Sequence, residues 1–231
     1  MKLLLISDIH SNFEALQEIL NHTDCDEILF AGDVVDYGPN PTDVFYILEY
    51  LKAKRVLGNH DAAAAFGIDC RSSAATYEAS VTTRKRITTQ LMPRKALELL
   101  GKAEKKLNLE FDGMRIRLLH AAPGDELYRY ITKDEASKLE IEDADLLVLG
   151  HTHIPYEVRR EKTWVVNPGS AGMPKDGDPR ASYAVLDTIK RQVEFKRIRY
   201  DVDLMLSQLR KLVGDDKQVF EQLAMIFSTG T

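Results

Sequence analysis

The chain has 231 residues, with 31 Lys and Arg against 36 Asp and Glu and a formal net charge of −5. This length accommodates one α/β domain with an insertion or two small domains, and a hydrophobic content of 44% argues against a disordered chain. Because the balance of charge is acidic, strong nucleic-acid binding through a basic face is disfavoured.

Membrane insertion and export are also disfavoured. No stretch approaches the ~20 apolar residues that span a bilayer, and the apolar run at 3–6 meets Asp8 and His10 before a secretory core can form. Cys25 and Cys70 show no paired spacing, which favours two inert thiols in a reducing compartment. We therefore expect a soluble cytoplasmic protein with no membrane partner.

The first third of the chain alternates short apolar runs with amphipathic ones, the pattern of a parallel sheet covered by helices. Strands are predicted at 2–6, 27–31 and 55–57. Ser11 opens a capping-box pattern that predicts a helix start, and Pro41 predicts the first turn of a second helix.

Residues 62–106 lack apolar strand runs and are rich in Ala, Thr, Arg, Lys and Leu, so we predict a helical insertion broken at Pro93. A β-rich half follows, with a hairpin turn at Asp112-Gly113. Its predicted strands are residues 107–111, 114–119, 145–149, 163–166, 182–186 and 192–199.

Two Leu-containing helices, at 202–213 and 217–227, are predicted to close the chain as part of the core or as a homodimer contact. Because no flexible linker or internal repeat interrupts the sequence, we expect one domain over residues 1–231.

Polar residues follow the apolar strands at their carboxyl ends, where open α/β sheets bind ligands. Five of the six histidines lie in these clusters. The clusters are Asp8 and His10; Asp33 and Asp36; Asn59, His60 and Asp61; His120; and His151 and His153. Imidazole and carboxylate without thiolate suit borderline divalent ions such as manganese, iron, zinc or cobalt.

Each cluster also has a simpler explanation. Gly-Asp or Gly-Asn after a strand is typical of a turn or a helix cap, and a lone Asp-x-His pair is common. Two histidines on one side of a strand end, as at His151 and His153, are costly to bury without a ligand. The ordered set supplies enough ligands for two metals, an arrangement suited to in-line displacement at phosphorus.

The ordered motifs resemble those of the calcineurin-like metallophosphoesterases. They are Asp8-x-His10, Gly32-Asp33-x-x-Asp36, Gly58-Asn59-His60-Asp61, His120 and Gly150-His151-x-His153, and the resemblance covers about residues 1–187 outside the insertion. Residues 33–39, 167–170 and 178–183 look most like the bacterial and archaeal phosphodiesterases and diadenosine-tetraphosphatase-related phosphatases. This resemblance implies an α/β fold, a four-layer α/β/β/α sandwich of two mixed β-sheets flanked by helices. Substrate specificity should lie in what overhangs the metals, so we expect residues 62–106, which the resemblance does not cover, to form a lid.

The resemblance also implies a role for each polar residue. The implied ligands are Asp8, His10 and His153 for one metal, Asn59, His120 and His151 for the other, and Asp33 as the bridge. His60 would lie over the substrate as an acid or transition-state stabiliser, with a pKa near the working pH. Asp36 would orient a ligand histidine or His60, and a simple helix cap is the alternative.

The implied reaction is hydrolysis of a phosphoric ester by a metal-bridging hydroxide. Its cofactors would be two divalent metal ions, manganese first, with iron, zinc, cobalt, nickel or magnesium as alternatives. The substrate would be a small phosphoester or nucleotide, and the sequence leaves open a monoester, a diester, a dinucleoside polyphosphate or a phosphoprotein. A non-catalytic metal-binding scaffold and a nuclease are the alternative functions.

Asn59, His60 and Arg180 are the predicted substrate contacts. Arg180 lies beside the 167–170 loop, and its guanidinium suits bidentate phosphate binding, although a surface position is the alternative. In the insertion, the basic residues Arg71, Arg84, Lys85 and Arg86 either reach a second phosphate or form a solvated helix face.

Overall fold

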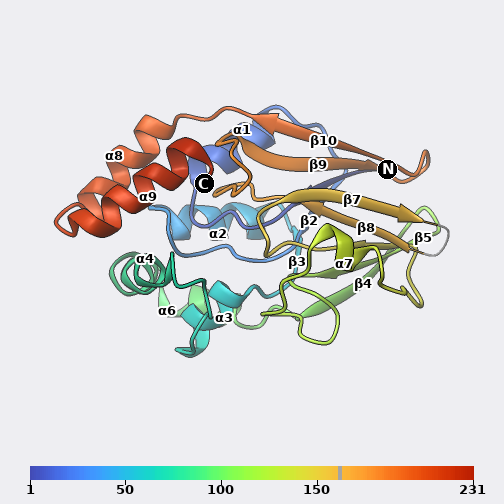
Figure 1. Ribbon diagram of the computed structural model, residues 1–231, viewed down its shortest axis with the longest axis horizontal. Coiled ribbons are helices and arrows are strands. Elements are labelled where there is room, and N and C mark those ends of the chain that lie inside the picture. The colour runs from blue at the N-terminus through green and yellow to red at the C-terminus, as the bar shows by residue number, and fades with distance from the viewer. Residues whose placement is uncertain (161–162) are drawn as a thin grey trace.

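The computed structural model describes residues 1–160 and 163–231, and two mixed β-sheets form its centre (Figure 1). Sheet A has the spatial order β10 (Gln192–Ile198), β9 (Ala181–Asp187), β1 (Lys2–Ile6), β2 (Glu27–Phe30) and β3 (Lys54–Arg55). Sheet B has the order β4 (Lys106–Phe111), β5 (Met114–Leu119), β6 (Leu146–Val148), β8 (Thr163–Pro168) and β7 (Pro155–Arg160).

Each sheet combines parallel and antiparallel pairs. In sheet A, β1, β2 and β3 are parallel, whereas β9 runs antiparallel to both β1 and β10. In sheet B, β5, β6 and β8 are parallel, and the edge strands β4 and β7 pair antiparallel to their neighbours. The parallel strands therefore end side by side in each sheet, which gathers the residues that follow them.

The apolar run of β1 is buried on both faces, as expected for a strand covered from both sides. Leu3 and Leu5 lie in the cluster between the two sheets, whereas Leu4 and Ile6 lie in the cluster that includes α1 (Phe13–Asn21) and α2 (Pro41–Tyr50). This alternation follows from the two-residue period of a strand. Burial of each such side chain stabilises the fold by about 1.5–3 kcal/mol.

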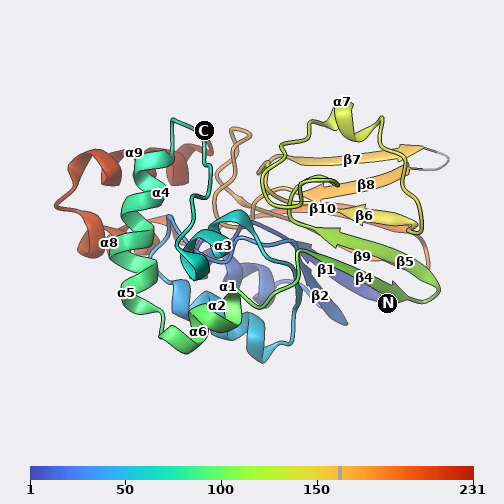
Figure 2. The ribbon, with the colours of Figure 1, turned by 90° about the horizontal axis from the view of Figure 1, so that it is seen from below.

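The outer layers differ in thickness. Helices α1 and α2 cover sheet A, whereas the short α7 (Lys133–Ala136) and its neighbouring loops cover sheet B. At the helical end, α8 (Val202–Val213) and α9 (Lys217–Thr229) form a third apolar cluster (Figure 2). The expected sandwich of two mixed sheets flanked by helices is confirmed.

Helices occupy most of the predicted insertion. They are α3 (Asn59–Phe66), α4 (Tyr77–Thr83), the π-helix η1 (Arg84–Thr88), α5 (Thr89–Leu91) and α6 (Arg94–Leu100). As predicted, Pro93 separates two helices, but α3 begins earlier than residue 62 and therefore contains Asn59 and His60. Side chains of α4 and η1 share the third apolar cluster with α8 and α9, which anchors this segment to the C-terminal helices.

Several local predictions were wrong. Asn12, not Ser11, caps α1, because its Oδ1 accepts the Ala15 N–H at 3.1 Å. The third strand covers Lys54–Arg55 rather than 55–57, since the Leu57 N–H turns away to the carbonyl of Glu104. Edge strand β7 and helix α7 were not predicted, because short, charge-rich segments carry little apolar periodicity. Within the described residues, no helix has the length and apolar character needed to cross a membrane.

Candidate metal centre

The polar clusters follow the carboxyl ends of β1, β2, β5 and β6, and one of them opens α3. The predicted ligands are all at most 5% exposed: Asp8, His10, Asp33, Asn59, His120, His151 and His153. So many buried polar side chains require compensating partners, because an unpaired buried polar group is costly.

The backbone of this region is held in an uncommon conformation. Positive φ angles between 47° and 70° occur at Asp8, His10, Asp33, Asp36, His151 and His153. Asp and His tolerate the left-handed region better than most residues, yet such strain costs on the order of 1 kcal/mol per residue and concentrates at functional sites. The turns after the strands thus direct these side chains inward.

Two glycines allow the clusters to approach one another. A Cβ on Gly58 would lie 2.0 Å from Asp33 Oδ1, and one on Gly150 would lie 2.9 Å from Asp8 Oδ2. Neither glycine has a positive φ. Their requirement is therefore space for a neighbouring carboxylate rather than the turn geometry that the sequence alone suggests.

His10 and His153 form one side of the centre together with Asp8. Their Nδ1–H groups donate to the carbonyls of Val35 at 2.9 Å and Met173 at 2.6 Å, which leaves both Nε2 atoms as acceptors. These two Nε2 atoms lie 3.2 Å apart, and Asp8 Oδ1 lies 3.4 Å from that of His153. Nitrogen and oxygen acceptors this close together fit ligands that share one cation.

His120 and Asn59 repeat this arrangement on the other side. The His120 Nδ1–H donates to the carbonyl of Ala31 at 2.7 Å, and the Asn59 amide donates to the carbonyl of Cys70 at 2.6 Å. The two remaining acceptors, His120 Nε2 and Asn59 Oδ1, lie 2.8 Å apart. The Asn59 oxygen and the His120 nitrogen thus face each other as two acceptors, as in the first pair.

Asp33 lies between the two sides. Its Oδ2 is 3.4 Å from His120 Nε2 and 3.7 Å from His10 Nε2, while its Oδ1 accepts the His60 N–H at 2.9 Å. Asp8 also faces both sides, because it forms possible metal-ligand groups with His10 and His153 and with Asp33 and His120.

His151 lies at the rim of the second side. Its ring centroid is 5.0 Å from that of His120, and its Nε2–H donates to the carbonyl of Tyr128 at 3.3 Å. Because a carbonyl accepts only, Nδ1 is the lone-pair nitrogen of this ring.

Asp61 holds the loops of the centre together, a role that the sequence analysis did not assign. Its buried carboxylate accepts the N–H groups of Asp33 at 3.0 Å, Val34 at 2.8 Å and Gly58 at 3.1 Å. An acidic residue in the first turn of a predicted helix was the available signal.

Burial sets the electrostatics of the cluster. Desolvation raises the pKa of Asp8 to about 7, and it raises the pKa of Asp33 as well. Desolvation also lowers the pKa of His151 to about 2 and holds those of His10 and His153 well below the ordinary value. Neutral imidazoles beside buried carboxylates are the donor set that a divalent cation stabilises.

His60 lies next to this cluster, and its side chain bonds to Asp36 rather than to a predicted ligand. Its Nδ1–H donates to Asp36 Oδ2 at 2.8 Å, and its ring centroid lies 5.0 Å from that of His10. Burial opposes a charge on the ring, but Tyr37, Asp33 and Asp36 outweigh it, so the pKa of His60 lies well above its ordinary value.

The π-helix η1 brings two further donors to the same carboxylate. Arg84 Nη2 donates to Asp36 Oδ2 at 2.5 Å, and Thr88 Oγ1 donates to Asp36 Oδ1 at 3.0 Å. π-Helical turns often occur at functional sites. Asp36 is therefore a junction between His60 and the insertion, which differs from the helix cap considered as an alternative.

The other predicted substrate contacts lie elsewhere. The Arg180 guanidinium is nearly half exposed and donates to Asp178 at 2.6–3.1 Å, so the structure does not bring it to the cluster. Arg71 lies over the Tyr128 ring at 4.3 Å, and Arg86 pairs with Asp215.

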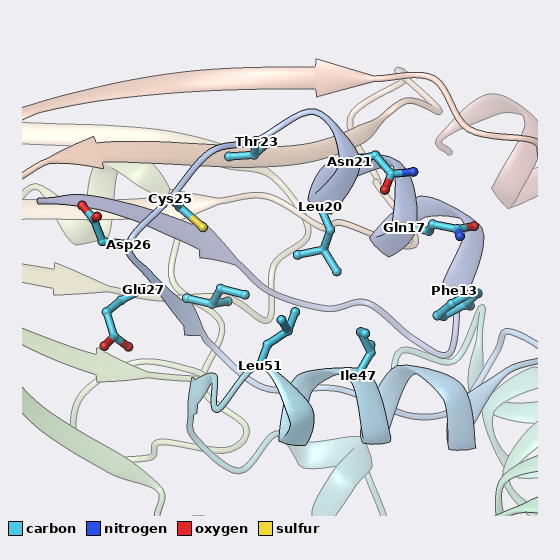
Figure 3. A pocket seen from close by; sticks show the side chains of 11 residues that line it. Phe13, Gln17, Leu20, Asn21, Thr23, Cys25, Asp26, Glu27, Ile47 and Leu51 are labelled. Carbon is cyan, nitrogen blue, oxygen red and sulfur yellow. The ribbon is translucent and has the colours of Figure 1, made fainter.

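A pocket of about 440 Å³ lies between α1, α2 and the start of β2, on the outer side of sheet A (Figure 3). Leu20, Ile47 and Leu51 line it together with the thiol of Cys25. None of its lining residues belongs to the polar cluster, so volume alone does not locate the chemistry.

Comparison with known proteins identifies the family of this chain. The model of the calcineurin-like phosphoesterase superfamily domain matches residues 1–191. Protein MJ0912 of Methanocaldococcus jannaschii is 29% identical over 217 residues, which cover 86% of this chain and 87% of that protein. Phosphodiesterase YfcE of Escherichia coli is 51% identical over 43 residues, 19% of this chain and 23% of its own.

A solved structure of similar shape is the metallophosphoesterase from Sphaerobacter thermophilus. It superposes with a TM-score of 0.83 at 27% identity, covering 100% of this chain and 99% of that one. The family resemblance read from the motifs is thus confirmed: this chain belongs to the calcineurin-like phosphoesterase superfamily.

Proposed function

We propose that this protein is a dinuclear-metal-dependent hydrolase of small phosphoric esters. The proposal rests mainly on two close contacts between hydrogen-bond acceptors. One joins His10 to His153 and the other joins His120 to Asn59. Asp33 Oδ2 lies between these two pairs. Two acceptors cannot hydrogen-bond to each other, so a hydrogen bond explains neither contact. Two cations that share the Asp33 carboxylate would explain both.

The residues present fit such a pair of ions. Asp8, His10 and His153 would hold one, Asn59, His120 and His151 the other, and Asp33 would contact both. When bound, the ions would activate water and offset the charge of the phosphoryl group. Because imidazole and carboxylate oxygen both contribute, manganese is our first choice, with iron, zinc, cobalt, nickel and magnesium as alternatives.

His60 is the proposed acid for the leaving alcohol. Its Nδ1–H is committed to Asp36, so Nε2 is the atom that carries the transferable proton. Arg84 and Thr88 hold Asp36 in place and thereby fix the ring of His60. The backbone N–H of His60 also donates to Asp33, which ties the acid to the bridging carboxylate.

The preferred substrate class is a phosphodiester or phosphomonoester, including nucleotides, and dinucleoside polyphosphates belong to the same chemistry. A cytoplasmic location, a lid function of the insertion and a homodimer through the terminal helices stay predictions. Arg180 stays a predicted phosphate contact only for a substrate long enough to reach it.

The test is metal-dependent hydrolysis by the full chain. The purified protein is stripped of metal and assayed on bis-p-nitrophenyl phosphate and p-nitrophenyl phosphate with manganese, cobalt, nickel, zinc or magnesium added back. We expect activity to return with metal and to fall by 10²–10⁴-fold in His60→Ala, whose metal content stays unchanged.

Binding of two ions without turnover of either ester would favour the non-catalytic scaffold instead. DNA binding that weakens steeply with salt would favour a nuclease.

A further inference from the structure

A small apolar pocket adjoins the centre on the side of His151 and His153. It has a volume of about 190 Å³ and is lined by residues 130–133 together with Thr152, Ile154 and Tyr156. Its base is firm, because Ile131 and Tyr156 are nearly fully buried and the Tyr156 hydroxyl donates to the Ile131 carbonyl at 3.4 Å.

The pocket and the centre share one segment of chain. Thr152 separates His151 from His153, and Ile154 follows them directly. The Tyr130 ring packs against the His151 ring with their centroids 4.3 Å apart. Tyr130 therefore belongs to both, because it contacts a predicted metal ligand and also lines the pocket.

The exposed part of the pocket is unusually apolar for a surface beside a charged cluster. Tyr130 is 50% exposed and Ile154 is 47% exposed, although the neighbouring predicted ligands are buried. Covering these side chains removes apolar surface from water, which favours an apolar occupant.

The volume restricts what that occupant can be. Sites for whole drug-sized ligands span roughly 300–1,000 Å³, so this pocket holds one ring system rather than a complete nucleotide. A planar ring suits it, because the Tyr130 face offers stacking, an interaction that tolerates any base or aryl group.

We propose that this pocket binds the aromatic group of the substrate's alcohol, an aryl ring or a nucleobase, while the phosphoryl group lies at the metal centre. This inference rests on the proposed function and names its substrate class as phosphoesters of aromatic-bearing alcohols. It also predicts little discrimination among bases.

The test compares two probes of matched charge, phenylphosphonate and methylphosphonate, by calorimetric titration of the manganese-loaded full chain. We expect the wild type to bind phenylphosphonate about tenfold more tightly, from the stacking contribution. Tyr130→Ala and Ile154→Ala should each remove most of that preference. Ile154→Ala should leave methylphosphonate binding unchanged, and it is the variant that tests the pocket without altering a side chain packed on His151.

Matched controls are Tyr46→Ala and Leu204→Ala, whose parent side chains are 48% and 47% exposed at remote positions. All four changes affect half-exposed side chains, so the fold is retained. The inference is overturned if the wild type shows no preference, if both probes lose affinity equally, or if the controls behave like the pocket variants.

Failure of the proposed function gives a different result. A preference for phenylphosphonate without hydrolysis of any ester would defeat the hydrolase proposal and keep the pocket assignment. Hydrolysis without that preference would defeat the pocket assignment alone, and absence of binding by both probes would defeat it together with phosphoryl binding at the centre.

Discussion

The metal-ligand cluster and the pocket beside it are built in opposite ways. In the cluster, His10, His120 and His153 are buried and each has one nitrogen tied to a backbone carbonyl. In the pocket, Tyr130 and Ile154 are half exposed and lie on loops. The first region allows one arrangement of its side chains, whereas the second tolerates substitution. The proposed catalysis therefore belongs to the buried region, and the proposed choice of substrate belongs to its half-exposed rim.

The largest effect is expected from changing Asp33, the carboxylate at the middle of the cluster. Asp33→Asn should lower activity by on the order of 10³-fold and reduce metal content, because a neutral amide cannot offset two cations. Measured kcat and metal analysis of the purified variant check this, with Asp178→Asn, a partly exposed carboxylate outside the cluster, as control. Full activity in Asp33→Asn would remove the bridging role.

A weaker effect is expected from changing Asp61, which contacts the backbone of the cluster and is not itself a predicted ligand. Asp61→Asn keeps the shape but removes a charge that receives three backbone N–H groups, so metal affinity should fall by about 10–100-fold. Titration of the stripped protein with manganese measures this change. Asp145→Asn, which alters a carboxylate at the surface, is the control, and equal affinity in both variants would contradict a positioning role for Asp61.

The insertion should influence turnover more than metal binding. Thr88→Val removes the hydroxyl that donates to Asp36, so we expect kcat to fall about threefold to tenfold while KM and metal content stay the same. Thr89→Val, in the adjacent position but with its hydroxyl on the Lys85 carbonyl, should leave kcat unchanged. A shift confined to KM would instead assign η1 to substrate binding.

The smallest effect is expected at Arg180. Because its guanidinium is exposed and paired with Asp178, Arg180→Ala should change kcat/KM for p-nitrophenyl esters by less than about twofold. The same assay with a dinucleoside polyphosphate tests the predicted phosphate contact. A tenfold loss with the longer substrate alone would establish that contact and extend the rim beyond the pocket.

The sequence determined the strands and the polar residues that follow them. Apolar runs such as residues 2–6 must be buried on both faces, and the ends of parallel strands meet at one edge, so Asp8, Asp33, His120 and His151 were predictable as neighbours. The motifs also indicated the family, because several separate ligand patterns occur in this chain in the same order as in the family. These features depend on short local patterns, which can be recognised from the amino-acid sequence alone.

Tertiary structure decided what surrounds those residues. Arg84 and Thr88 meet Asp36 across separations of 48 and 52 residues, and helical charge and hydroxyl patterns carry no signal for such contacts. Tyr130 reaches His151 from a loop without periodicity. Packing places these side chains, and packing is a property of the folded surfaces rather than of any short segment.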